Sequence, residues 1–163
     1  MNDERLAQLV TPFYLAMMRL NALESDESML CAVAHAGREA SPAEVVQLLR
    51  SAWRPRVMGA WYALLHDDPD IPGEVLASLA SSEGSLTSPP LAVAAAVLTG
   101  AGSIGALERY AAIDVVREFG ACGFVAAAIE HVGGTANACR PSADDLAHFD
   151  GLLHVAKRLR AIQ

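Results

Sequence analysis

The chain has 163 residues and a formal net charge of −7, because 19 acidic side chains outnumber 12 basic ones. A negative protein repels phosphate backbones, so this balance argues against nucleic-acid binding and suits a basic protein partner. Hydrophobic residues make up 53% of the chain and aromatic residues only 6%, and no segment shows the two-residue period of a strand. The composition predicts one all-α domain over residues 1–163, long enough to bury a core.

The three cysteines, Cys31, Cys122 and Cys139, show no paired spacing. An odd number without a pattern predicts reduced thiols and a cytoplasmic protein. The charged start of the chain, with no uninterrupted apolar segment after it, predicts no secretory signal. The uncharged stretch before Glu108 holds its continuous apolar run in residues 91–98, far below the roughly 20 residues of a membrane span. We expect a buried core helix there and no membrane association.

Helical periodicity and capping signals predict eight or nine helices joined by short linkers. Ser41 followed by Pro42 and Glu44 is a capping box, and Ser142 with Asp145 starts the last helix in the same way. In chain order the expected helices cover residues 3–20 with a bend at 11–12, 26–37, 42–54, 55–65, 72–81, 89–99, 104–112, 115–132 and 142 to the C-terminus.

A pattern made of a large residue, an alanine and a second large residue recurs every 34 residues. It begins at Val57, Leu91 and Val125, with alanine at positions 60, 94 and 128. Small central residues let helices approach closely, so each unit is interpreted as a helical hairpin that packs on the next. The repeat predicts an α-solenoid, a stack of antiparallel helical hairpins.

Residues 54–64, with a proline between two arginines before a valine, alanine and leucine pattern, resemble the inner helix of a HEAT repeat. Residues 10–15 and 48–61 are similar to a family of bacterial HEAT-like proteins of unknown function, and the resemblance extends over residues 10–133. It implies a HEAT-like fold and no defined activity; an immunity-type or adaptor role is a fold-level analogy. Where the family pattern has a Tyr-Asp-Gln element, this chain has residues 117–119, Arg-Glu-Phe, so any function of that element is in doubt.

Arg54 and Arg56 flank Pro55 at a predicted helix start, where the helix dipole disfavours positive charge. Two interpretations stand. The arginines pair with carboxylates of the same chain, such as Glu44 or the aspartates near residue 70, or they bind an anionic ligand or partner. The nearby Trp53 and Trp61 lie on apolar stripes and are expected in the core.

The acidic turn after this helix contains Asp67, Asp68 and Asp70, which are candidate contacts for a basic partner. A proline at position 69 and the lack of a glycine-bearing loop argue against a calcium site. His66 is interpreted as a histidine favoured by a helix C-terminus, and Cys122 as a buried thiol. We therefore predict no catalytic residues, no metal and no cofactor.

The main hypothesis is a non-enzymatic HEAT-like module that binds another, basic protein through its concave face or acidic turn. The alternative is a binder of small anions, or an enzyme, that uses Arg54 and Arg56 in a cleft between helices. A homodimer that buries apolar surface is a third interpretation.

Overall fold

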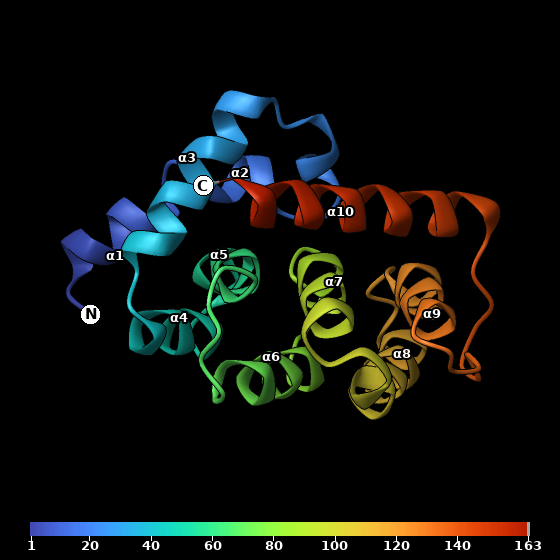
Figure 1. Cartoon of the computed structure of the whole chain (residues 1–163). Helices are drawn as coiled ribbons and strands as arrows, with labels where there is room; N and C mark the ends of the chain where they lie inside the picture. The colour runs from blue at the N-terminus through green and yellow to red at the C-terminus, as the bar shows by residue number, and fades with distance from the viewer. Residues whose placement is uncertain (163) are drawn as a thin grey trace.

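The computed structural model describes residues 1–162, and within them every regular element is helical. Nine helices have eight residues or more, which agrees with the expected number, and α2 is a single turn (Figure 1). The elements are α1 (Asp3–Val10), α2 (Tyr14–Met17), η1 (Asn21–Glu24), α3 (Glu27–Glu39), α4 (Pro42–Leu49), α5 (Trp53–Ala63), α6 (Ile71–Ala80), α7 (Ser88–Thr99), η2 (Gly100–Ser103), α8 (Ile104–Arg117), α9 (Cys122–His131) and α10 (Ala143–Ala161).

Helices α4 to α9 form three consecutive hairpins that lie side by side. In each hairpin the first helix joins one row, α4, α6 and α8, and the second joins another, α5, α7 and α9 (Figure 1). The second row is the central layer of the molecule, because α1, α2 and α3 cover α5 while α10 packs along α7 and α9. Residues 57–63 of α5 and 88–96 of α7 are accordingly buried all round, as expected of helices without a polar face.

The residues of the 34-residue spacing all fall on the central layer. Ala60, Ala94 and Ala128 are completely buried on α5, α7 and α9 respectively. Small side chains at equivalent points let the three helices approach one another and their hairpin partners. Gly59, next to Ala60, shows one such close approach, because a Cβ atom there would lie 2.9 Å from the Leu49 amide nitrogen of α4.

Two buried side chains of α5 form hydrogen bonds with the N-terminal segment that contains α1 and α2. The Trp61 indole donates to the Met17 carbonyl oxygen at 2.8 Å, and the Tyr62 hydroxyl donates to the Leu9 carbonyl oxygen at 2.7 Å. The first helix, predicted over residues 3–20 with a bend at 11–12, is instead broken there into two: α1 ends at Val10, and α2 covers only Tyr14–Met17. Trp61 is fully buried as expected, whereas Trp53 is only partly buried.

Both predicted capping boxes are present, at Ser41 with Glu44 and at Ser142 with Asp145. The boundary between α4 and α5 differs from the prediction. Helix α4 ends at Leu49, and Trp53 and Arg54 begin α5 instead of ending the helix before it. Pro55 is tolerated as the third residue because the first turn of a helix needs no amide donor.

The break between α8 and α9 also lies later than predicted. Helix α8 continues to Arg117, and Glu118 and Gly120 both have positive φ, 55° and 85°. Asp114, expected in a linker, is buried within α8 and accepts hydrogen bonds from the Gly120 and Ala121 amides at 3.0 and 2.9 Å. Its carboxylate thus shapes the turn that follows.

Residues Ser88–Arg117 are apolar and long enough, by composition alone, to count as one candidate membrane span. In the structure this stretch is two helices in different rows, and the chain turns between them at Gly100, where φ is 51°. Its first half, α7, is the buried central helix that the sequence predicts.

Candidate functional site

The five predicted binding residues lie at opposite ends of α5. Arg54 and Arg56 belong to its beginning, whereas Asp67, Asp68 and Asp70 follow its C-terminal end. A helix of 11 residues is about 16 Å long at 1.5 Å per residue. The arginines and the aspartates therefore belong to two separate places on the surface.

Arg54 stacks on aromatic rings and not against a carboxylate. Its guanidinium carbon lies 5.3 Å from the Tyr14 ring centroid and 5.0 Å from that of Trp53. The two rings meet edge to face with centroids 5.7 Å apart. This cation–π arrangement orients an exposed guanidinium. Tyr14, from α2, was not recognised from the sequence, because nothing local connects it with residues 53 and 54.

Glu44, proposed as a carboxylate partner for Arg54 and Arg56, forms its ion pair with Arg5 instead. Arg5 Nε donates to Glu44 Oε1 at 2.9 Å. This hydrogen bond is the main cause that lowers the pKa of Glu44, and the Ser41 amide of the capping box adds to it. Among residues 1–162 neither Arg54 nor Arg56 has an ion pair, so the predicted intrachain carboxylate pairing is wrong.

Arg56 has a structural role toward the preceding helix. Its Nε donates to the Leu49 carbonyl oxygen, at the C-terminal end of α4, at 3.2 Å. A cation there complements the helix dipole and satisfies a carbonyl without an intrahelical partner. Half-burial lowers the pKa of the Arg56 guanidinium, a group whose ordinary pKa is high enough to keep it charged at neutral pH.

The acidic turn forms one wall of a shallow groove of about 550 Å³ beside α4. Asp68 and Asp70 line it, and Pro42, Ala43 and Val46 supply apolar surface. Asp68 Oδ1 accepts from the Asp70 amide at 3.0 Å, which holds the two carboxyl groups on one turn. Asp67 is exposed and does not line this groove.

Arg50 is the basic residue that lines the acidic groove, and it forms an ion pair with Glu74. Arg50 Nε donates to Glu74 Oε2 at 2.8 Å, and a second guanidinium nitrogen bonds the other carboxylate oxygen. This bidentate pair raises the pKa of Arg50 and lowers that of Glu74. In the part of the chain that the structure covers, no cation forms an ion pair with Asp68 or Asp70.

His66 forms a hydrogen bond with a backbone carbonyl group. It does not belong to a group of metal-ligating side chains in the described part of the chain. Its Nε2 lies 2.9 Å from the Gly37 carbonyl oxygen, so it holds the end of the α5 segment against α3. Within residues 1–162, no group of three or more His, Cys, Asp or Glu side chains could hold a metal ion.

Cys122 and Cys139 form a disulfide, so the expectation of three reduced thiols is wrong for these two, and Cys122 is not a free buried thiol. Cys31 is free and exposed. The bridge spans 17 positions, a separation that matches no familiar motif. It forms because the chain returns across α8 and α9 before α10, which only the tertiary structure reveals.

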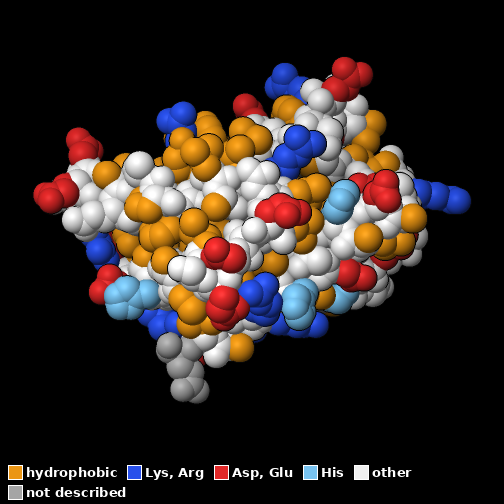
Figure 2. Space-filling view, turned by 90° about the horizontal axis from the view of Figure 1, so that it is seen from above, with side chains coloured by type: hydrophobic (Ala, Val, Ile, Leu, Met, Phe, Trp, Pro, Cys, Tyr) orange, Lys and Arg blue, Asp and Glu red, His pale blue; other side chains and the backbone are white. Residues whose placement is uncertain are grey.

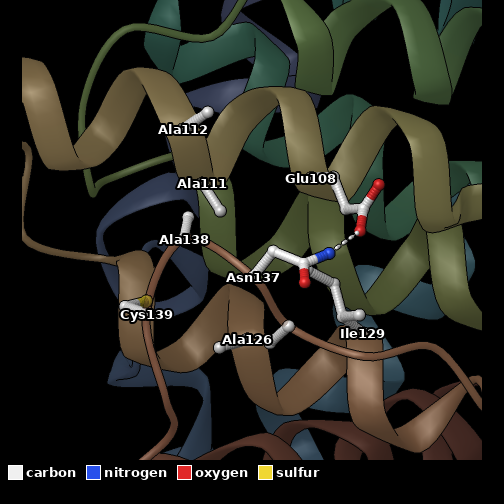
Figure 3. Close-up of a pocket in the computed structure, with 9 residues that line it drawn as sticks. Glu108, Ala111, Ala112, Ala126, Ile129, Asn137, Ala138 and Cys139 are labelled. Carbon is white, nitrogen blue, oxygen red and sulfur yellow. Dashed lines mark hydrogen bonds between the residues drawn. The ribbon is translucent and has the colours of Figure 1, made fainter.

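The returning chain covers a small cleft between α8 and α9, shown in Figure 3. Ala111, Ala126 and Ile129 form apolar walls, and Asn137 and Cys139 lie on the loop above them. Asn137 Nδ2 donates to Glu108 Oε1 at 2.9 Å. The cleft has a volume of about 310 Å³ and contains no nucleophile with an adjacent base.

The face above α3 and α10 carries mixed charge. Figure 2 shows acidic and basic side chains interspersed there, with hydrophobic atoms exposed between them. Such a face lacks the concentrated positive field that phosphate backbones require.

Comparisons of this chain with protein-family models, with curated proteins and with solved structures give no match. The resemblance to HEAT-like proteins therefore stays a prediction from sequence. Function has to be argued from the sites themselves.

Proposed function

We propose that this protein is a non-enzymatic, HEAT-like α-solenoid module that binds another protein, with the acidic groove beside α4 as its docking surface. The arrangement of three hairpins in two rows supports the solenoid. The placement of equivalent alanines on α5, α7 and α9 supports a repeating unit.

One observation supports the acidic groove as the docking surface. The carboxylates of Asp68 and Asp70 line a groove with apolar surface from α4, while the adjacent Arg50 is already paired with Glu74. Negative charge beside apolar surface fits a segment with lysine or arginine side chains, whose aliphatic stems lie along Ala43 and Val46 and whose charged ends reach the aspartates.

The partner is accordingly a basic protein, and the sharpest form of the proposal is an immunity-type or adaptor role. Charge pairs at the rim of an interface act mainly on the association rate and weaken with salt. Binding should therefore become weaker as ionic strength rises.

The test compares the partner recovered by affinity purification with wild-type protein and with the double variant Asp68→Lys, Asp70→Lys. A matched control, Asp150→Lys with Glu130→Lys, makes the same charge change at exposed positions of α10 and α9. The proposal expects a basic partner that binds the wild type and the control but not the groove variant. Equal recovery with all three proteins would contradict it.

A second candidate function, the binding of an anionic ligand, is favoured by the surroundings of Arg54. Arg54 is exposed, held over Tyr14 and Trp53, and without an ion-pair partner among residues 1–162. A site of this kind suits an anionic metabolite or an acidic peptide. Thermal-shift measurements with di- and tricarboxylates and phosphorylated metabolites test it, because a ligand that binds the native state must raise the unfolding temperature. Stabilisation that Arg54→Met abolishes would support this function, and no shift at millimolar ligand would reject it.

A further inference from the structure

In the loop of residues 132–142, between α9 and α10, residues 132–134 are held at the end of α9 by backbone hydrogen bonds, and the rest is attached to the helical stack mainly by one covalent bond. Cys139 of this loop is bonded to Cys122, the first residue of α9. Between residues 135 and 141, one side chain makes a hydrogen bond outside the loop, from Asn137 to Glu108 at 2.9 Å. Thr135, Asn137, Ala138 and Arg140 are exposed, and in this segment the small side chain of Ala136 is the one packed against the hydrophobic core, so apolar burial contributes little to holding it.

The loop lies across the end of the hairpin stack, where a further hairpin would continue the pattern of the rows (Figure 1). It covers the cleft of Figure 3, whose walls come from Ala111 and Ala112 of α8 and from Ala126 and Ile129 of α9. A terminal unit in a stack of this kind needs a cover over its apolar face. The loop supplies that cover, and the disulfide keeps it in place.

We propose that the Cys122–Cys139 disulfide is a redox-controlled clasp, which a dithiol reductant opens by thiol–disulfide exchange. A thiolate of the dithiol attacks the Cys139 sulfur, the Cys122–Cys139 bond breaks, and Cys122 leaves as a thiolate that takes up a proton. The second thiol of the reductant then attacks its own sulfur in the mixed disulfide and releases Cys139. One dithiol is oxidised to a disulfide and one protein disulfide is reduced to two thiols.

The two sulfurs differ in their surroundings. Cys139 is on the loop and lines the cleft, which Cys122 does not line, and this is the side from which a reductant would approach the bridge. The Cys122 sulfur belongs to α9 and lies 3.8 Å from the Ala111 carbonyl oxygen of α8, between the two helices. Exchange rates depend on which sulfur can be approached, and this geometry assigns the attack to Cys139.

Opening the clasp releases the loop without unfolding the helices on either side. Helix α10 is held by its own core contacts: Phe149 packs on Phe124 of α9 with ring centroids 5.6 Å apart, and Leu152 and Leu159 are completely buried. Regions with few buried contacts open locally, independently of global unfolding. Reduction therefore uncovers the apolar walls of the cleft while the stack persists.

Hydrogen exchange followed by mass spectrometry on the full chain tests the clasp. Cys31→Ser serves as the background, so that the exposed free thiol cannot rearrange the disulfide. We expect dithiothreitol to speed the exchange of amides 133–140 by about tenfold or more, the signature of a local opening, while α5 is unaffected. A Cys139→Ser variant in the same background should show the fast loop exchange without reductant.

Three results would overturn the proposal. The first is unchanged loop exchange after complete reduction. The second is faster exchange spread equally over α5 and the loop, because the disulfide would then stabilise the whole fold and not a clasp. The third is the absence of a Cys122–Cys139 linked peptide in protein purified under non-reducing conditions.

The site of attack is tested with a monothiol, glutathione, followed by alkylation of the freed thiol and peptide mapping. The proposal expects glutathione on Cys139 and the alkyl group on Cys122. The reverse distribution would contradict attack at the loop sulfur.

Discussion

The Tyr62 hydroxyl donates a hydrogen bond to the Leu9 carbonyl oxygen at 2.7 Å, across 53 positions of the chain. It joins the central layer to α1 where both residues are almost fully buried. Burial raises the pKa of Tyr62, so the phenol keeps its proton and stays a donor in any ordinary buffer. This contact, with that of Trp61 to Met17, explains why α1 and α2 cover α5.

Replacing Tyr62 by phenylalanine should lower the free energy of unfolding by about 1–3 kcal/mol, since the buried Leu9 carbonyl loses its partner. Urea denaturation measures the change. Tyr14→Phe is the matched control, because the Tyr14 hydroxyl makes no hydrogen bond within residues 1–162. Equal effects of the two variants would mean that the Tyr62 hydrogen bond contributes nothing specific.

Two glycine-to-alanine changes should act in opposite directions. Gly59→Ala places a methyl group 2.9 Å from the Leu49 nitrogen and should destabilise the protein by about 1–3 kcal/mol through overpacking. Gly73, in α6, has no atom within 4 Å of the added Cβ, so Gly73→Ala should stabilise by up to about 1 kcal/mol. Thermal unfolding of both variants checks the signs. A stabilising Gly59→Ala would refute close packing of α4 on α5.

The disulfide should contribute more to local order than to global stability. Cys139→Ser should lower the free energy of unfolding by well under the about 3 kcal/mol that a bridge closing a loop of this length usually gives, because the released loop gains conformational freedom in the folded state as well as in the unfolded chain. Denaturant titration measures it, and the variant should be insensitive to reductant. Cys31→Ser removes the exposed free thiol and should leave the stability within about 0.5 kcal/mol of the wild type.

Glu44 should make the stability of the protein depend on acid pH. Its pKa is lowered from 4.5 by Arg5 and the capping box. A group whose pKa is lower in the folded state stabilises the protein above its unfolded-state pKa, and that contribution is lost as pH falls through the folded value. Glu44→Gln should therefore destabilise the protein at neutral pH, and the difference from wild type should shrink below pH 4.5.

Unfolding midpoints measured from neutral to acid pH test this prediction for Glu44. Because the side chain is partly exposed, solvent screening keeps the effect small. Glu130→Gln, at an exposed position of α9, is the control for loss of one negative charge. A constant difference between the wild type and Glu44→Gln across the range would contradict the assignment.

Local signals determined much of this fold before any tertiary contact was considered. The structure contains the predicted caps at Ser41 and Ser142 and the alanine spacing of α5, α7 and α9. The bend predicted at residues 11–12 marks the place where the first helix breaks in two. Each depends on residues within one or two turns, where backbone hydrogen bonding and helical periodicity act. The acidic turn was likewise visible as a run of aspartates.

Tertiary structure decided what depends on distant residues. The end of α8 is set by Asp114, a carboxylate buried by packing and bonded to the amides of the next turn. Arg54 faces Tyr14, and Glu44 is occupied by Arg5. The loop after α9 brings Cys139 to Cys122. Partners of this kind are selected by which surfaces the folded chain brings together, and local periodicity carries no information about that choice.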